Sequence, residues 1–414
     1  MVRESREIRN TFWALCITFA LLIAIGTANV FSATFVEDYV TGGNSFSHLF
    51  QQGKLLAIGA VFSGVVYRIK YQRLQKYAWI GILIAVLLLI GVLFAGTVVN
   101  GARRWIIVMG ISFQPSEVAK LAGILSAASY ISLSLEKHRP VAFFPWLHHG
   151  SNKTGWWKRL CPHKALIGPL IMALLVFKQP DAGTAIIIFS IPCLMLWIGG
   201  ARLSQIKWLV GILACIAVVG IVIEPYRMNR IIAWLDPWGY SKTLGYQTVQ
   251  GLITIGSGGI FGQGVGEGIS KFNYLPEAHT DFAFAVVAQE WGLCGSIFIL
   301  ILFSAILYFG AMTARHCQDR FNMFLAIGIT LYLGGQGLVN ICMVSGMVPV
   351  VGIPLPFISY GGTALVVNMM AAAVLLKICR SNQKEALKRE IENMAVTVTS
   401  MKEETRSQFP LKPQ

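Results

Sequence analysis

Charged residues are scarce in this sequence. Aspartate, glutamate, lysine and arginine make up 13% of the 414 residues, whereas a soluble domain carries roughly 25%. Hydrophobic residues reach 55%, and the mean hydropathy is +0.63. This balance excludes a soluble globular protein and predicts an all-α integral membrane protein with several spans.

Paired cysteines and nucleotide-binding motifs are also missing. The eight cysteines fall mostly in apolar runs without CxxC spacing, which argues against a disulfide framework or a cysteine metal site. The glycine-rich run at 256–268 lacks the GxxxxGK[ST] pattern of a phosphate-binding loop. We expect irregular backbone there, packed on the membrane domain. No cofactor is evident, and no cluster of metal ligands is visible.

The positive charge of the chain is distributed as membrane topology requires. The net charge of +15 would suit nucleic acid, but most lysines and arginines lie in alternate loops between apolar runs. This alternation indicates cytoplasmic loops, so we expect no nucleic acid partner. About ten spans fit the chain, near residues 11–35, 55–69, 78–98, 118–135, 165–177, 183–200, 208–223, 282–312, to about 344, and 362–378.

An even number of spans places both termini on the same side as the basic loops, and the positive-inside rule assigns that side to the cytoplasm. The long segment between the seventh and eighth spans, residues 224–281, is then extracytoplasmic. We expect a membrane domain over 1–380 and a charged cytoplasmic tail over 381–414.

Several cations break the positive-inside pattern because they lie in outward segments rich in Gly, Pro and Trp. They are Arg103, Arg104, Lys120, Lys178, Arg227, Arg230, Lys242 and Lys271. Contact with anionic lipid headgroups is one interpretation. The other is a site for a phosphorylated lipid, because guanidinium groups match phosphate geometry. Trp105 suits either a bilayer anchor or such a site.

Two outward segments are predicted helix starts. Pro115 suits the first helical position, and Glu117 suits the positive end of the helix dipole. Glu117 and Lys120 lie one turn apart, so they could instead pair for a structural purpose. Asp181 is predicted to cap the helix that follows it, in preference to a catalytic role.

Three ionisable residues, Glu277, His279 and Asp281, lie just before the eighth predicted span. Ionisable groups at a membrane edge usually serve function. Asp281 could also cap the span, while Glu277 and His279 could shape the loop. Deeper in the span, Glu290 must face protein or water, where it could pair with a cation or brace a neighbouring helix.

Together these motifs resemble the SEDS family (shape, elongation, division and sporulation) from about residue 11 to 380. The matching segments are 101–105, 114–117 with Lys120, 179–184, 225–230, 236–238, 245–247, 275–281 and 358–362. The segments 275–281 and 245–247 are more similar to the division member FtsW, or to the sporulation member SpoVE, than to the elongation member RodA.

The resemblance implies a peptidoglycan glycosyltransferase that polymerises lipid II outside the bacterial cytoplasmic membrane. It assigns catalysis to Asp281. Substrate binding then falls to Arg103, Arg104, Trp105, Lys120, Arg227, Arg230, Lys271 and His279, with structural roles for Glu117, Asp181, Glu277 and Glu290. A divalent cation could help to neutralise the diphosphate.

The resemblance also implies a class B penicillin-binding protein, a transpeptidase, as partner, together with divisome proteins at the septum. The role in division remains open against elongation and sporulation. Two other functions stay open as well. A lipid II flippase needs polar residues spread through its spans, and a scaffold acts only by holding partners.

Overall fold

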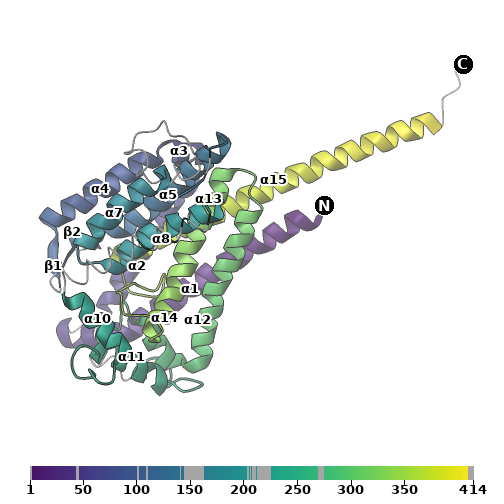
Figure 1. The fold of residues 1–414 in the computed structure, drawn as a ribbon. Coiled ribbons are helices and arrows are strands. Elements are labelled where there is room, and N and C mark those ends of the chain that lie inside the picture. Colours follow the sequence, from purple (N-terminus) through teal and green to yellow (C-terminus); the bar gives the residue numbers. More distant parts are fainter. Residues whose placement is uncertain are drawn as a thin grey trace, which may run out of the picture.

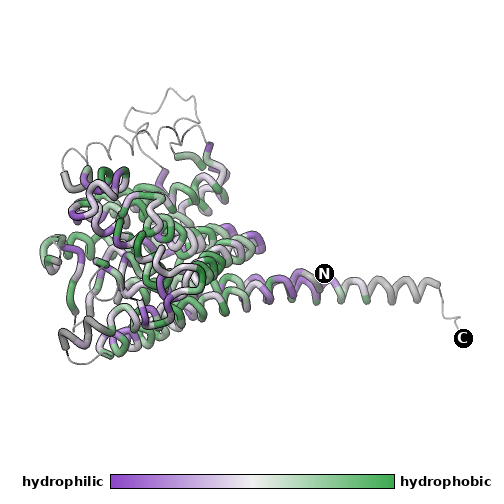
Figure 2. The backbone as a smooth tube through the Cα atoms, turned by 90° about the horizontal axis from the view of Figure 1, so that it is seen from below, coloured by the Kyte–Doolittle hydropathy of each residue, from purple (hydrophilic) through white to green (hydrophobic). Residues whose placement is uncertain are grey.

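The computed structural model describes residues 2–42, 46–99, 102–108, 111–139, 141–143, 163–202, 205, 207, 211, 225–268 and 275–408. Helices dominate this part of the chain, as the sequence predicts. Figure 1 shows most of them packed side by side in one bundle. In Figure 2, hydrophobic segments gather in the bundle, and hydrophilic residues mark the place where α1 and α15 leave it.

The helices within the described residues are α1 (Val2–Gly42), α2 (Ser47–Arg68), α3 (Tyr71–Lys76), α4 (Ala78–Ala95), α5 (Pro115–Glu136), α7 (Lys164–Lys178), α8 (Ala182–Ile198), α10 (Pro225–Leu235), α11 (Tyr246–Ser257), α12 (Ala283–Arg315), α13 (Arg320–Thr330), the π-helix η3 (Leu331–Gly335), α14 (Gln336–Val344) and α15 (Gly362–Gln408). The strands are β1 (Thr97–Val99), β2 (Ala102–Val108) and β3 (Ile111–Phe113).

Seven helical segments in the described chain are long and apolar enough to cross a membrane. They lie in α1, α2, α4, α5, α12, the continuous α13–η3–α14 unit and α15, and each coincides with a predicted span. The predicted fifth and sixth spans correspond to α7 and α8, which have 15 and 17 residues. The predicted seventh span lies outside the described residues except for residue 211. The count of ten and the cytoplasmic termini stay predictions.

A small β-sheet occupies a segment that we expected to be a loop. The antiparallel strands have the order β1-β2-β3, and Thr97 pairs with Trp105 while Ile106 pairs with Phe113. The strands are short, and they follow directly on the strongly apolar sequence of α4. Their pairing is therefore a tertiary outcome that hydropathy does not reveal.

The last helix is longer than its predicted span. α15 runs unbroken from Gly362 to Gln408, so no break marks the predicted domain boundary at residue 380. In the bundle, α15 packs along α2 and α1. Figure 1 shows α10 and α11 at the opposite end of the bundle from both termini.

The glycine-rich run packs on a kink in α12, as we predicted for irregular backbone. Gly292 interrupts the helix with φ 68°, a conformation that favours glycine. The run supplies hydrogen bonds on both sides of the break. Gln263 and Gly264 donate to the carbonyls of residues 289 and 290, while residues 293 and 294 donate to those of 259 and 260.

Candidate functional site

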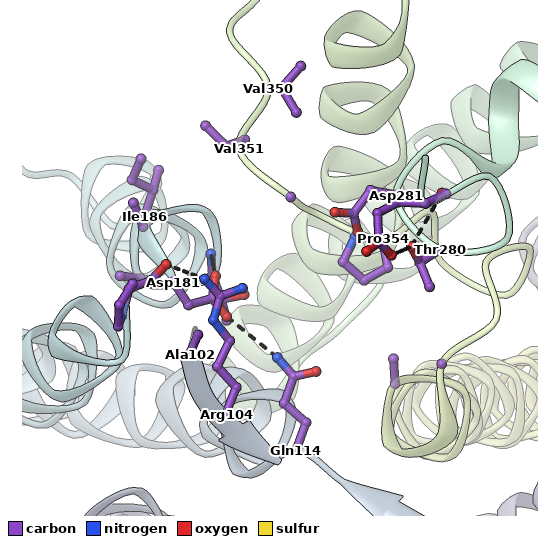
Figure 3. Close-up of a pocket in the computed structure, with 18 of the residues that line it drawn as sticks. Ala102, Arg104, Gln114, Asp181, Ile186, Thr280, Asp281, Val350, Val351 and Pro354 are labelled. Atoms are coloured by element: carbon purple, nitrogen blue, oxygen red, sulfur yellow. Dashed lines mark hydrogen bonds between the residues drawn. The ribbon is translucent and has the colours of Figure 1, made fainter. Parts of the chain in front are cut away.

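A large cavity of about 1100 Å³ lies where β2, α7, α8, α10 and the two segments before α12 and α15 meet. Figure 3 shows that its walls come from regions far apart in the sequence. One part of the wall is charged and polar, with Arg104, Asp181, Arg230 and Asp281. The other part is apolar, with Leu174, Phe177, Ile186 and Phe189 among its residues.

Asp281 lies half-buried at the polar end of the cavity. The N-cap of α12 is Phe282, which makes no side-chain cap hydrogen bond, so Asp281 does not cap this helix as the alternative interpretation required. Its carboxylate lies against Gly352, where a Cβ atom would come within 3.2 Å of Asp281 Oδ2. Gly352 also has φ 72°. A glycine is therefore required beside the carboxylate.

The surroundings of Asp281 raise its pKa to about 7. Burial is the main cause, because removal from water disfavours the charged carboxylate. The negative charges of Glu277 and Asp181 add to this rise, whereas the positive charges of Arg230 and Arg104 lower the pKa. At neutral pH, the protonated and ionised forms of Asp281 are therefore both populated.

The strand β2 separates the two neighbouring arginines. Arg104 faces the cavity, where its Nε donates to the carbonyl of Gln179 (3.1 Å) and its Nη2 to that of Pro180. Arg103 is exposed and lies outside the cavity wall. Successive side chains of a strand point to opposite faces. In this strand, which we had expected to be a loop, Arg104 and not Arg103 lines the cavity. A substrate contact of Arg103 stays a prediction.

Trp105 lies in the cavity wall beside Arg104, whose guanidinium carbon is 6.0 Å from the Trp105 ring centroid. This separation allows a cation–π interaction. The indole therefore belongs to the cavity rather than serving only as a bilayer anchor.

The long segment between the seventh and eighth predicted spans contributes a second cavity cation. Arg230 on α10 is exposed at the cavity wall, and its Nη1 donates to the carbonyl of Val350 at 2.9 Å. Arg227 lies one turn earlier on the same helix, but its side chain is outside the described part of the structure. Lys271 also falls outside the described residues. The roles of Arg227 and Lys271 therefore stay predictions.

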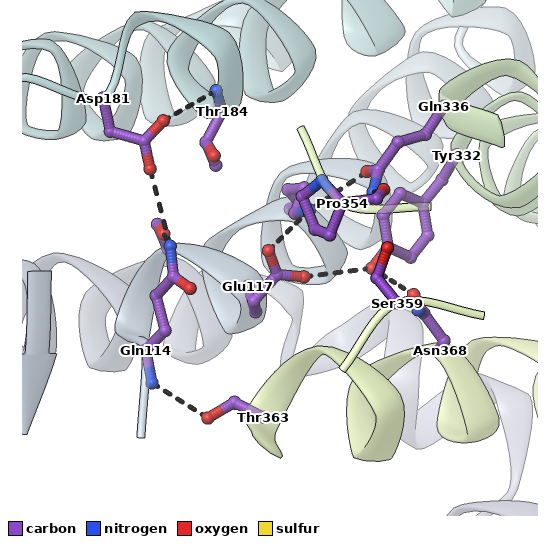
Figure 4. Close-up of polar contacts among 12 residues, drawn as sticks. Gln114, Glu117, Asp181, Thr184, Tyr332, Gln336, Pro354, Ser359, Thr363 and Asn368 are labelled. Atoms are coloured by element: carbon purple, nitrogen blue, oxygen red, sulfur yellow. Dashed lines mark hydrogen bonds and ion pairs between the residues drawn. The ribbon is translucent and has the colours of Figure 1, made fainter. Parts of the chain in front are cut away.

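Asp181 caps α8, as the sequence predicts. Its Oδ1 accepts from the backbone N–H of Thr184 at 3.1 Å. Its Oδ2 accepts from Gln114 Nε2 at 3.5 Å, as Figure 4 shows. Asp181 also lines the cavity, so this cap adds a negative charge near Asp281.

Glu277 and His279 both line the cavity. Glu277 has φ 55°, and its Oε2 accepts from Thr280 Oγ1 at 2.6 Å, so its side chain and backbone shape the turn before α12. The His279 ring centroid lies 5.9 Å from that of Tyr360. His279 therefore faces both the cavity and an aromatic wall.

Lys120 occupies a buried polar network rather than the cavity. Its Nζ lies 2.8 Å from Glu117 Oε1 and donates to Gln336 Oε1 at 3.0 Å. Figure 4 shows this network extending through Tyr332 to Asn368, whose Oδ1 accepts from the Tyr332 hydroxyl at 2.6 Å. Lys120 is 2% exposed. The structure favours the alternative of a structural pair with Glu117, and a substrate contact of Lys120 stays a prediction.

Glu290 is buried in α12, and its Oε1 accepts a hydrogen bond from Ser32 on α1. This contact joins two helices that pack together. It agrees with the interpretation of Glu290 as a brace between helices.

Sequence reasoning missed the polar residues of the segment from α13 to α14. Gln336 and Asn340 lie one turn apart on α14 and are 3% and 0% exposed, and both contact the chain around the cavity. Two amide side chains one turn apart in an otherwise apolar span were the available signal.

Within the described ranges, no group of three or more His, Cys, Asp or Glu side chains could hold a metal ion. The use of a divalent cation stays a prediction.

Comparison with known proteins gives relatives along nearly the whole chain. The family described as "Cell cycle protein", which groups FtsW, RodA and SpoVE, matches residues 12–384. A probable peptidoglycan glycosyltransferase FtsW of Aliivibrio salmonicida is 36% identical over 86% of each chain. Stage V sporulation protein E of Bacillus subtilis is 35% identical over 88% of this chain and 96% of its own.

Solved structures show the same fold. A chain from work on "structural coordination of polymerization and crosslinking by a peptidoglycan synthase complex" has a TM-score of 0.69 and 27% identity, covering 89% of this chain and 98% of its own. Thermus thermophilus RodA, a rod shape determining protein, has a TM-score of 0.62 and 26% identity, covering 89% and 97%. The chain therefore belongs to the FtsW/RodA/SpoVE family of cell cycle proteins.

Proposed function

We propose that this protein is a peptidoglycan glycosyltransferase that polymerises lipid II into glycan strands, with Asp281 as the general base. One observation carries the proposal: a carboxylate with a pKa of about 7 shares an amphipathic cavity with two arginines. The names of the curated relatives support the enzyme class, because several are probable peptidoglycan glycosyltransferases.

The reaction needs one base and a site for a diphosphate. The 4-hydroxyl oxygen of the acceptor sugar attacks the anomeric carbon of the donor and forms the new glycosidic bond. The bond from that carbon to the phosphate oxygen breaks with inversion, and undecaprenyl diphosphate leaves with the electron pair. The hydroxyl proton passes to Asp281. A diphosphate is already a good leaving group, so a second carboxyl as in glycoside hydrolases is not required.

The pKa of Asp281 suits the role of base at neutral pH. General-base catalysis is most efficient when the pKa of the base lies near the working pH, and it contributes about 10²–10⁴-fold in rate. An ordinary aspartate, with a pKa of 3.8, would be ionised but weakly basic. Burial beside Glu277 and Asp181 therefore makes this carboxylate the stronger base.

The two cavity arginines suit the leaving diphosphate. Arg104 uses its Nε and Nη2 groups to hold the backbone at 179–180, and this fixes the plane of its guanidinium. Arg230 is fixed in a similar way by the carbonyl of Val350. Cations held before the reaction begins stabilise developing negative charge without further rearrangement.

The apolar wall suits the lipid part of the substrate. Leu174 on α7 and Ile186 on α8 line the cavity and are 50% and 58% exposed on a bundle that we treat as membrane-embedded. A polyprenyl chain could therefore extend from the polar end towards the lipid between these helices. The cavity of about 1100 Å³ is slightly larger than typical small-molecule sites of roughly 300–1,000 Å³.

A lipid II flippase is the alternative from another class. Such a transporter needs polar groups that line a path across the membrane. The two charged residues Lys120 and Glu117 deep in this bundle instead pair with each other, and they are 2% and 1% exposed. This closed network favours the enzyme.

The remaining parts of the proposal follow from the family. We infer ten spans with cytoplasmic termini, so that the cavity faces outward. We also infer a class B penicillin-binding protein as partner, other divisome proteins, and a place at the septum. The sporulation relative leaves a role outside division open.

The test is polymerisation of fluorescent lipid II by purified protein in nanodiscs. Asp281→Asn removes the base and keeps the shape, so we expect lipid II binding within about twofold of wild type and a rate lower by about 10²–10⁴-fold. The matched control is Glu267→Gln, which makes the same chemical change at an exposed carboxylate outside the cavity.

Full polymerisation by Asp281→Asn would refute the assignment of the base. A flippase would show loss of lipid II translocation in the same variant, measured in vesicles with a membrane-impermeant quencher. The enzyme is supported if translocation by wild-type protein is absent while polymerisation is strong.

A further inference from the structure

Three consecutive backbone carbonyls hold the turn that carries Asp281 against the rest of the bundle. Each accepts a hydrogen bond from a different donor in α14 or in the segment before α15: His279 from the backbone N–H of Tyr360 (2.7 Å), Thr280 from Ser359 Oγ (2.5 Å) and Asp281 from Asn340 Nδ2 (2.9 Å). Figure 3 shows Thr280 and Asp281 beside Pro354 of this segment.

Asn340 joins two parts of the cavity wall. Its Nδ2 donates to the carbonyl of Asp281 and also to that of Ile353 at 2.6 Å. Ile353 follows Gly352, which contacts the carboxylate of Asp281. The Asn340 amide thus holds the backbone of Asp281 in place relative to the segment at 352–353, which borders the Asp281 side chain.

The orientation of the Asn340 amide is determined by these contacts. Its Nδ2 faces two carbonyl oxygens, so the reverse orientation would place Oδ1 against two acceptors. Asn340 is fully buried, and Oδ1 has no hydrogen-bond partner within the described chain. Burying an amide with one unsatisfied end is unfavourable, which argues that its two donated bonds serve a purpose beyond packing.

A second amide supports the same segment from one turn earlier. Gln336 Nε2 donates to the carbonyl of Pro354 at 2.9 Å, while Gln336 Oε1 accepts from Lys120. The Glu117–Lys120 pair therefore orients Gln336, and α14 presents two amide donors to adjacent carbonyls of the segment. Figure 4 shows the hydrogen bond from Gln336 to Pro354.

We propose that Asn340 is a positioning residue for the glycosyl transfer, which holds the Asp281 carboxylate at the distance and angle required by the acceptor hydroxyl. The inference rests on the proposed function, in which Asp281 is the base. It adds a residue that does not touch the substrate and acts only through the backbone of Asp281 and the neighbouring segment. A misplacement of the base by about 1 Å costs roughly 10²-fold in rate.

The experiment replaces Asn340 with Leu, which keeps the volume and removes both donated bonds. The matched control is Asn382→Leu. Asn382 is also a buried amide in the bundle, and its Nδ2 donates to the carbonyl of Thr313 at 2.9 Å. It lies away from the cavity, so its loss disturbs packing without disturbing the base.

We expect kcat to fall by about 10–10²-fold in Asn340→Leu, with lipid II affinity within about threefold of wild type. Asn382→Leu should lower the thermal midpoint about as much as Asn340→Leu does. It should keep kcat within about threefold of wild type for the folded fraction. Equal loss of kcat in both variants, or a wild-type kcat in Asn340→Leu, would overturn the inference.

A second variant decides the matter if Asn340→Leu does not fold. Asn340→Asp is nearly isosteric, and its protonated form still donates one hydrogen bond, whereas its ionised form repels both carbonyls. Its kcat relative to wild type should fall as the pH rises. A constant ratio across pH would contradict the positioning role.

These outcomes separate the inference from the function on which it rests. If Asp281→Asn is inactive and both Asn340 variants behave as wild type, only the positioning role fails. If Asp281→Asn is active, the proposed base itself fails.

Discussion

The pH dependence of polymerisation is the sharpest consequence of the proposed base. The pKa of Asp281 is about 7, so the ionised fraction should rise from about 9% at pH 6 to about 91% at pH 8. The rate kcat/KM should therefore rise about tenfold across this interval and level off above it. A carboxylate with the ordinary pKa of 3.8 would give a flat profile over the same range.

A single substitution tests the cause of that shift. The negative charge of Glu277 helps to raise the pKa of Asp281. Glu277→Gln removes this charge, so we expect the pKa of Asp281 to fall and the midpoint of the profile to move to lower pH. The variant should therefore gain activity relative to wild type at pH 6. At pH 8, where Asp281 is mostly ionised in both proteins, it should be somewhat slower because a lower pKa makes a weaker base.

The assay is the initial rate of glycan formation from fluorescent lipid II in nanodiscs between pH 5.5 and 8.5. Glu267→Gln removes an exposed carboxylate outside the cavity and should leave the midpoint unchanged. A rate that stays flat or falls between pH 6 and 8 would refute the reasoning. A midpoint that moves to higher pH in Glu277→Gln would do so as well.

The same pKa predicts an effect on stability. A carboxyl whose pKa is raised by folding stabilises the folded state below pH about 4, and this contribution is lost as the pH rises through about 7. Asp281→Asn lacks the dependence. The thermal midpoint of Asp281→Asn, measured relative to that of wild type, should therefore rise between pH 5 and pH 8.

Three further substitutions test the placement of the cations. Arg104→Ala should lower kcat/KM by about 10²–10³-fold, as loss of a preorganised charge does. Arg103→Ala, on the opposite face of β2, should keep kcat/KM near that of wild type. Equal effects of the two variants on glycan formation would contradict the different roles of the two arginines. Lys120→Met leaves Glu117 buried without its partner and should destabilise the protein by about 3–5 kcal/mol, seen as a lower thermal midpoint in detergent. A partial recovery in the double variant with Glu117→Gln is expected, and no loss in the single variant would show that the pair does not matter.

Local features of the site were predictable from the sequence. The start of α5 at Pro115, the pairing of Glu117 with Lys120 and the cap formed by Asp181 all involve residues within one turn of each other. Interactions over three or four positions follow from helix geometry alone. Most of the spans were likewise predictable, because their hydropathy is a property of each segment.

The contacts between segments were not predictable in this way. Lys120 faces Gln336 and Tyr332 instead of the cavity because α5 packs against α13. Its outward-segment position in the sequence gave no sign of that orientation. The hydrogen bonds that hold the turn at Asp281 similarly depend on Asn340 and Ser359, which lie 59 and 79 positions from the groups that they bond.

The sequence by itself therefore determined the membrane class and the family, since composition and ordered motifs carry these, and the family resemblance made Asp281 the candidate for the catalytic base. Only the tertiary structure decided which cations share a cavity with that carboxylate. Arg103 and Arg104 are adjacent and chemically identical, and the pairing of β2 with its neighbouring strands turns one outward and the other inward. The pKa of Asp281 has the same origin, because burial and the charges of distant segments exist only once the chain has folded.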